Sequence, residues 1–277
     1  MLVAASVGDP RMMDRVAATF DENSMRHRRP SILLTILLFL AGGTASGETG
    51  VRKPADSGTH VVGRYGSLRA MFHEGRTGAR VSLKDLLPNE NLYALGAIAD
   101  LAGEITVLNG IAYLDRPTGN DSAQTEVTTE SGEGAALLVT AEVGRWSEFI
   151  TERPIAFAEL EEAIERYAHD AGIDLGIPFP FLLEGDLQAL RWHVIDGRRL
   201  KGGGDSHTDH LAAAVTFERK RTRATLLGFY SASDHGVFTH MGSKTHVHCV
   251  VEDPRSSGHV DHVVIPAGAT LRFPDGS

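Results

Sequence analysis

Four histidines fall between residues 246 and 262, near the C-terminus of the 277-residue chain. His246 and His248 are two apart in an apolar, strand-like run, so both side chains leave the same face of a strand. Together with His259 they form a His-x-His plus distant His set, which supplies the three neutral donors and the free position of an open zinc site. Imidazole donors also suit copper, nickel or iron, so the set does not fix the metal. His262, three residues beyond His259, is expected to point away from the ligand face.

The turn between these histidines presents a geometric difficulty. A tight hairpin centred near Arg255 would pair His259 with a residue near Glu252, roughly 13 Å from His248. Convergence of the three imidazoles therefore requires a bent or barrel-like sheet, or a return strand that is not a simple neighbour. On spacing alone, histidines that pack in the core or face solvent without metal remain the competing interpretation.

The other histidines and the single cysteine narrow the choice of ligands. His207 and His210, in the stretch "HTDH", could form a second site, although a solvated loop is the favoured interpretation. His235 and His240 are expected to be loop residues that lie near the site at most. Because Cys249 is the sole cysteine, an internal disulfide and a multi-thiolate zinc site are excluded.

The composition is that of a globular protein, with 42% hydrophobic and 23% charged residues. The length allows one large domain or two small ones. A formal net charge of −9 argues against nucleic acid or an anionic membrane surface as the main partner. A homodimer is compatible with the sequence, which does not set the oligomeric state.

Residues 25–47 have the three-part pattern of a secretory signal peptide: a cluster of arginines, a short apolar stretch and then small residues. Cleavage is expected after Ala45 or Gly47, so that residues 1–47 are removed and no membrane span remains. An uncleaved anchor is the alternative, although the apolar stretch is shorter than the roughly 20 residues that span a bilayer. Residues 1–24 are expected to be an over-extended start. The mature protein is expected to be secreted or periplasmic.

The rest of the chain mixes helices and strands without a regular βαβ alternation, which indicates an α+β fold with strand-rich sheets or a barrel-like C-terminal part. Helices are expected at 65–75, 81–88 and 156–172. Strands are expected within 91–117, where Gly103 and Asn109-Gly110 mark two turns, and at 136–143, 179–185, 190–197, 223–231, 245–252 and 262–273. Polar or glycine-rich loops are expected at 118–134 and 198–210. The expected division is a flexible leader (48–63), an N-terminal α/β part (64–185) and a metal-binding, β-rich part (186–277).

The stretch "LLGFYSASDHGVFTHMGSKTHVHCVVEDPRSSGHVDHVVIPAG" resembles the C-terminal core of the α-acetolactate decarboxylase family. In that family a glycine-bearing turn leads into a His-x-His strand, and a "GGHV"-like segment after an acidic loop carries the third zinc histidine. His246, His248 and His259 fall on those three positions. A second stretch, "LGAIADLAGEITVLNGIAYL", is similar to the family's N-terminal motif and places Glu104 on its active-site glutamate. The resemblance covers residues 64–272, most weakly in the middle.

The chain departs from the family pattern in the middle. Counting from Gly185 along a strand–turn–strand unit places His193 where the family carries an active-site arginine. Arg191 lies two residues earlier and could share the same strand face. His193 could replace the arginine as a hydrogen-bond donor and proton source, since an imidazole suits proton transfer near neutral pH. The alternative is a strand histidine packed beside Trp192.

A second departure concerns the family's metal-facing glutamate near the C-terminus. No equivalent glutamate follows the third histidine here. Glu252 or Asp253, which precede that histidine, could take the role instead. Glu104, which without the resemblance would be an exposed turn residue, becomes an acid or base beside the metal.

The resemblance implies an exported, zinc-dependent carboxy-lyase that converts 2-acetolactate to acetoin and CO₂. Zinc would act as a Lewis acid on the enediolate left when CO₂ departs, and Glu104 and His193 would move protons or orient the substrate. Two alternatives stay open: a related metalloenzyme acting on another small 2-hydroxy-keto acid, and a non-catalytic metal- or carboxylate-binding protein.

Overall fold

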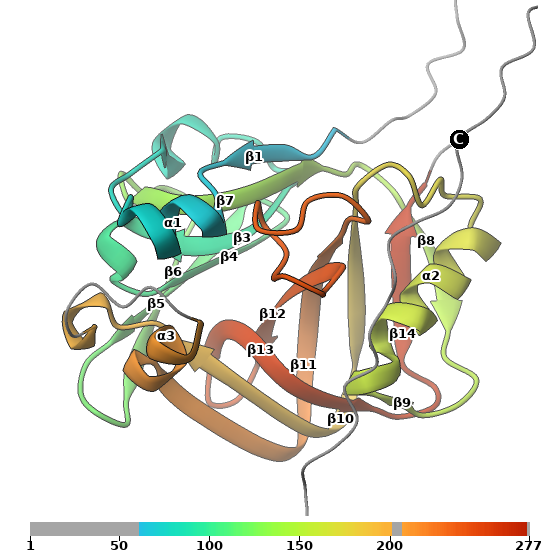
Figure 1. The fold of residues 1–277 in the computed structure, drawn as a ribbon. Helices are drawn as coiled ribbons and strands as arrows, with labels where there is room; N and C mark the ends of the chain where they lie inside the picture. Colours follow the sequence, from blue (N-terminus) through green and yellow to red (C-terminus); the bar gives the residue numbers. More distant parts are fainter. Residues whose placement is uncertain (1–60, 201–206, 276–277) are drawn as a thin grey trace, which may run out of the picture. The chain divides into compact units, whose positions relative to one another are not determined.

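The computed structural model describes residues 61–200 and 207–275. The expected signal peptide and nearly all of the expected leader lie outside the described residues. Within the described ranges the strands form two seven-stranded antiparallel sheets, accompanied by a few short helices (Figure 1). This arrangement confirms the expected strand-rich α+β fold.

The first sheet has the order β1-β7-β3-β4-β5-β6, with β2 also paired to β7. Its strands are β1 (Gly63–Tyr65), β2 (Val81–Ser82), β3 (Leu92–Ile98), β4 (Glu104–Leu108), β5 (Ile111–Pro117), β6 (Ala123–Thr128) and β7 (Gly134–Glu142). The turn from β4 to β5 is the expected tight hairpin, because Asn109 and Gly110 both have positive φ, 52° and 76°. The expected loop at 118–134 is wrong in part, since it contains β6. That edge strand is polar on both faces, so no apolar alternation marks it in the sequence.

The second sheet has the order β8-β14-β10-β11-β12-β13-β9. Its strands are β8 (Trp146–Ile150), β9 (Ile155–Ala156), β10 (Phe179–Val194), β11 (Val215–Tyr230), β12 (Thr245–Val251), β13 (Ser256–Ile265) and β14 (Thr270–Pro274). The strand expected at 262–273 is two strands, separated by a turn that contains Gly268 at φ 83°. In this sheet β10 also pairs with β13, so β10, β11, β12 and β13 close a ring of pairings.

Strand β10 corrects the turn expected at Gly185-Asp186. The strand pairs with β11 along its whole length, so the two expected strands are one, and the expected division between residues 185 and 186 falls inside it. A Cβ added at Gly185 would lie 3.1 Å from the Ala269 Cβ. The absence of a side chain at Gly185 therefore lets the segment around Ala269 approach the strand closely, which is a common reason for a glycine within a strand.

The helices of the described residues are short. Helix α1 (Leu68–Glu74) forms within the range expected to be helical, 65–75, and is capped by the Ser67 hydroxyl. The expected helix at 81–88 is a single 3₁₀ turn, η1 (Leu83–Asp85), capped by Ser82. Helix α2 (Leu160–Asp170) begins later than expected, because β9 and the 3₁₀ turn η3 (Phe157–Glu159) precede it. None of the helices in the described ranges has the length and apolarity needed to cross a bilayer.

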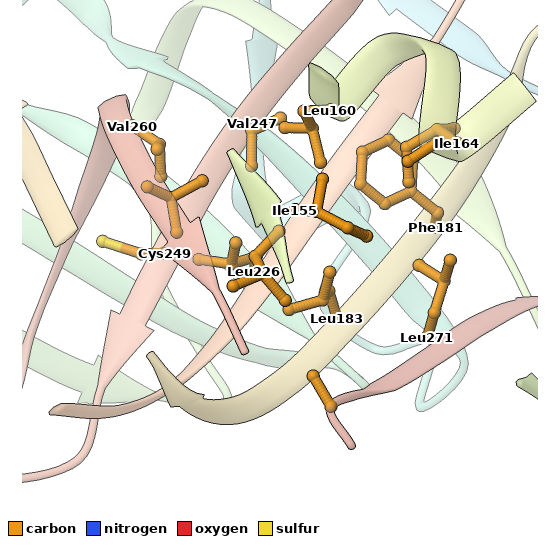
Figure 2. Close-up of a cluster of buried hydrophobic side chains, with 14 of the residues drawn as sticks. Ile155, Leu160, Ile164, Phe181, Leu183, Leu226, Val247, Cys249, Val260 and Leu271 are labelled. Atoms are coloured by element: carbon orange, nitrogen blue, oxygen red, sulfur yellow. The ribbon is translucent and has the colours of Figure 1, made fainter. Parts of the chain in front are cut away.

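Helix α2 covers one face of the second sheet (Figure 2). Leu160 and Ile164 of the helix share a core cluster with Val247 and Cys249 of β12. Each such buried aliphatic side chain contributes about 1.5–3 kcal/mol relative to leaving it in water. Because side chains alternate along a strand, the residues between them leave the opposite face of the sheet.

That opposite face packs on the first sheet. Tyr93 and Leu95 of β3 share a second core cluster with Leu227 and Phe229 of β11. The faces of β12 and β11 that point away from α2 are therefore enclosed between the two sheets. The histidines of β12 lie on this enclosed side.

Candidate metal centre

The register of the β12–β13 hairpin brings the three expected histidines together. His248 lies directly opposite His259, and Val251 opposite Ser256, on adjacent antiparallel strands. The expected offset between His248 and His259 is wrong, because the loop at 252–255 centres the hairpin earlier than residue 255. His246 and His248 share one strand face, and His259 lies across from His248, so two neighbouring strands are enough to bring the three imidazoles together.

The three imidazoles have the spacing of a tetrahedral metal site. Their candidate ligand atoms all lie within 4.8 Å of one another. The ring centroids of His246 and His248 are 5.1 Å apart, those of His246 and His259 4.8 Å, and those of His248 and His259 5.6 Å. Three imidazoles on one tetrahedral ion, with metal–nitrogen bonds near 2.0–2.1 Å, would have centroids about 5 Å apart.

Two ring nitrogens of the cluster lack a hydrogen-bond partner among the described residues: Nδ1 of His246 and Nε2 of His248. Both residues are buried, and a buried polar atom without a partner costs about 1–3 kcal/mol. Burial lowers the pKa of His246 to about 3 and holds the pKa values of His248 and His259 well below their usual range. All three rings are therefore neutral, which is the form that binds a metal. The donor set fits a divalent cation.

A threonine on the first sheet orients one of these rings. The Thr106 hydroxyl on β4 lies 3.1 Å from Nδ1 of His248. This contact occupies Nδ1 and leaves Nε2 toward the other histidines, as the hydrogen-bonded partner behind a metal-bound histidine usually does. Thr106 was not among the expected site residues, although it lies two positions after Glu104 and so shares its strand face.

Replacing Thr106 by valine is expected to weaken metal binding by about 10–100-fold, because the His248 ring loses the partner that fixes its orientation. Thr106→Ser, which keeps the hydroxyl, is the matched control and should retain most of the affinity. Competition with a chelating indicator measures both constants. Equal affinities for the valine and serine variants would contradict the orienting role.

Glu104 lies beside the histidines, at the start of β4. Its side chain is buried rather than exposed in a turn, and Oε2 lies 3.7 Å from Nε2 of His248. Oε1 accepts a hydrogen bond from the backbone N–H of Ile195 at 3.2 Å. Burial raises the pKa of the Glu104 carboxyl well above its usual range, and the Ile195 hydrogen bond only partly opposes this effect.

A cavity opens over the cluster. His246, His259, Glu104 and His193 all line it. The remaining lining is mainly apolar: Leu68, Met71, Phe72, Ala97, Leu101, Leu137, Ile195 and Leu211. Arg191, the expected alternative to His193, is exposed and does not line this cavity. Of the side chains in the described ranges, no arginine or lysine does so.

Two further histidines lie closer to the site than expected. His210 belongs to helix α3 (His207–Ala213), where a solvated loop was expected, and it is buried and lines the cavity. His240 also lines the cavity, with its ring centroid 5.5 Å from that of His259. The helix was missed because seven residues after a glycine-rich run carry little periodic signal. His262, as expected, is not part of the metal cluster, and its ring packs 5.9 Å from Phe157.

The two acidic residues considered as substitutes for the family's C-terminal glutamate do not reach the site. Glu252 and Asp253 are exposed in the loop between β12 and β13, and neither lines the cavity. Glu252 instead pairs with Arg223 at 3.3 Å. Glu104 is therefore the carboxyl group that lines the cavity in the described residues.

Two carboxylates, Glu161 (partly buried) and Asp115 (buried), fix both ends of the ligand hairpin. Oε1 of Glu161 on α2 accepts hydrogen bonds from the backbone N–H groups of Lys244 and Thr245, at 2.7 and 3.2 Å, where β12 begins. Asp115 on β5 accepts the backbone N–H of Ser257 at 3.1 Å and the Thr125 hydroxyl at 2.8 Å, where β13 begins. These contacts tie the hairpin to α2 on one side and to the first sheet on the other.

The buried imidazoles also predict an acid sensitivity of the metal-free protein. Below about pH 6.5 the histidines of the unfolded chain take up protons, whereas the folded chain keeps His246 neutral. The free energy of unfolding therefore decreases as the pH is lowered through this range. His246→Gln should make the free energy of unfolding less steep by about 1.4 kcal/mol per pH unit between roughly pH 6 and 4. Urea unfolding at several pH values measures the slopes. His169→Gln, at an exposed histidine of α2, is the control, and equal slopes for all three proteins would contradict the prediction.

The fold and the site together define a class of protein: a two-sheet α+β protein with a buried three-histidine cluster that could hold a metal ion, and a carboxyl group in the cavity beside it. The family model for alpha-acetolactate decarboxylase matches residues 65–273. The chain therefore belongs to the α-acetolactate decarboxylase family.

Solved structures of this family share the fold. The α-acetolactate decarboxylase of Bacillus subtilis strain 168 has a TM-score of 0.58 at 14% identity, covering 76% of this chain and 85% of its own. The acetolactate decarboxylase of Bacillus subtilis subspecies spizizenii has a TM-score of 0.60 at 15% identity, covering 77% and 85%. A Staphylococcus aureus protein of unknown function, described as similar to α-acetolactate decarboxylase, has a TM-score of 0.59 at 12% identity, covering 76% and 84%. No curated protein matches the sequence. The chain is thus a divergent member.

Proposed function

We propose that the protein is a zinc-dependent decarboxylase that converts 2-acetolactate to acetoin and CO₂. The observation that carries this proposal is the pair of buried, unpartnered nitrogens on His246 and His248, beside a cavity that also contains Glu104. Membership of the family supplies the reaction. The three imidazoles suit zinc, whose open sites use three protein donors and leave one position for a ligand.

His246, His248 and His259 would hold the zinc, which supplies Lewis-acid stabilisation of negative charge on substrate oxygens. In the reaction the bond between the carboxylate carbon and C2 breaks, CO₂ leaves, and the electron pair moves toward the neighbouring carbonyl oxygen. One proton then adds to carbon, so the acetolactate anion and a proton give acetoin and CO₂. Glu104 is the group placed to deliver that proton, because it is the carboxyl group among the described residues that lines the cavity beside the three histidines.

The apolar wall of the cavity and His193 would bind the substrate. The apolar side chains of α1, of which Leu68 and Met71 line the cavity, would contact the substrate's methyl groups and exclude water. His193, on β10, presents a polar ring to the same space and would hydrogen-bond a substrate oxygen. In this role it stands where the family resemblance places an arginine.

A second substrate is favoured by one observation: no arginine or lysine among the described side chains lines the cavity, while eight apolar residues do. A related 2-hydroxy-keto acid with a larger alkyl group would use that wall. Purified, zinc-loaded protein offered 2-acetolactate and its longer-chain homologues separates the two candidates by the ratio of kcat/KM values. Preference for 2-acetolactate supports the first, and a preference of about tenfold or more for a homologue supports the second.

Export is part of the proposal and rests on residues 25–47, which lie outside the described residues. The arginine cluster, apolar stretch and small residues of that segment match a signal peptide. Fractionation of cells that express the full chain tests it. A processed protein in the periplasm or medium would support export, and a full-length protein confined to the cytosol would contradict it.

A further inference from the structure

Strand β13 contains a β-bulge beside the metal cluster. His259 pairs with His193 on β10, Val260 pairs with Trp192, and His262 pairs with Arg191. Asp261 is therefore the extra residue, without a partner of its own on β10. Bulges of this kind occur next to active sites, where they redirect a side chain.

The bulge turns the Asp261 carboxylate onto the ring of His193. Oδ1 of Asp261 lies 2.8 Å from Nδ1 of His193, and the two side chains are only 17% and 10% exposed. Since a carboxylate only accepts hydrogen bonds, Nδ1 must carry the proton. In the neutral ring the other nitrogen, Nε2, then has a free lone pair.

The His193 ring lies beside the candidate metal cluster. The ring lines the cavity together with Glu104 and His246, and its centroid lies 4.9 Å from that of His259. Gly258 makes this approach possible, because a Cβ at that position would lie 2.4 Å from the carbonyl oxygen of His193. A lone pair on Nε2 is the complement of a hydroxyl group in the cavity.

We propose that Asp261 is a positioning residue that fixes His193 in the Nδ1–H tautomer, so that Nε2 accepts a hydrogen bond from the 2-hydroxyl group of the substrate. The pair thereby selects 2-hydroxy-3-oxo acids over 3-oxo acids that lack the hydroxyl. A site built to bind a hydroxyl discriminates strongly against the analogue without it, because its polar atom is left unpaired. This inference rests on the proposed decarboxylase function.

The tautomer can be measured without turnover. In zinc-loaded protein labelled with ¹⁵N-histidine, the resonances of His193 are assigned by their loss in His193→Gln. A proton on Nδ1 is expected in the wild type. In Asp261→Asn the side-chain amide can donate to Nδ1, which shifts the ring proton to Nε2. A wild-type ring with its proton on Nε2 overturns the inference, and that result does not depend on the folding of Asp261→Asn.

Turnover gives the second readout. Asp261→Asn is expected to lower kcat by about 100-fold with the zinc content unchanged. It should also lower the ratio of kcat/KM for the 2-hydroxy-3-oxo acid to kcat/KM for the 3-oxo acid that lacks the hydroxyl. Glu252→Gln, which removes an exposed carboxylate from the same hairpin, is the matched control and should keep wild-type kcat. An Asp261→Asn enzyme within threefold of wild type overturns the inference. If zinc-loaded wild type turns over no 2-hydroxy-3-oxo acid, the proposed function fails, and the nitrogen spectrum alone decides the role of Asp261.

Discussion

Replacing His248 by alanine is expected to reduce the metal content of the purified protein from about one ion per chain to less than about a tenth, and to abolish turnover. His248 is fully buried, its Nε2 has no other partner among the described residues, and its loss leaves two of three donors. Catalytic zinc sites use three protein ligands, so a site reduced to two is expected to lose its metal during purification. Metal analysis after gel filtration, beside circular dichroism to confirm folding, measures the effect.

The matched control for this change is His262→Ala. That histidine lies on the same hairpin, but its ring packs on Phe157 outside the cluster. We expect the His262→Ala protein to keep its metal. If His248→Ala retained wild-type metal, the cluster would be a set of core histidines, which was the competing interpretation of the sequence.

Replacing Glu104 by glutamine is expected to leave the metal in place and to lower kcat by roughly 10²–10⁴-fold. The amide has the shape of the protonated carboxyl, and its oxygen can still accept the hydrogen bond of Ile195. Its N–H protons are far less acidic than a carboxylic acid proton, so the amide cannot protonate carbon. The kinetics and the metal content of the same preparation together measure the effect.

Glu142→Gln, at an exposed carboxylate on β7, is the control for the Glu104 prediction and should match the wild type in both measurements. A Glu104→Gln enzyme with normal kcat would remove Glu104 from the chemistry. A protein that binds metal but shows no turnover in the wild type or in any variant would instead favour the non-catalytic binding protein.

The shared strand face of two candidate ligands could be predicted because it depends on local periodicity. Two histidines at a spacing of two must share a strand face, and this held for His246 and His248. Their meeting with His259 could not be derived from spacing, since the register of a hairpin depends on where its loop is centred, and a shift of one or two residues there changes every pair. The family resemblance supplied what spacing could not.

The rest of the site depends on contacts between segments far apart in the chain. Glu104 and Thr106 are buried because the first sheet packs on β12, and nothing in their local sequence shows that covering. The contact of Asp261 with His193 requires a bulge, which adds one residue without changing composition. His210 reaches the cavity through a seven-residue helix that lacks a clear period. The sequence therefore predicts the three histidines that could hold a metal, and Glu104 through the family resemblance, but not Thr106, Asp261 or His210.

Turnover of 2-acetolactate is the measurement that tests the central claim most directly. Protein carrying about one zinc ion per chain is predicted to release one CO₂ and one acetoin per substrate consumed. The activity should disappear when the metal is removed by a chelator and return when zinc is added back. Zinc-loaded, folded protein that forms no acetoin from 2-acetolactate would contradict the assignment.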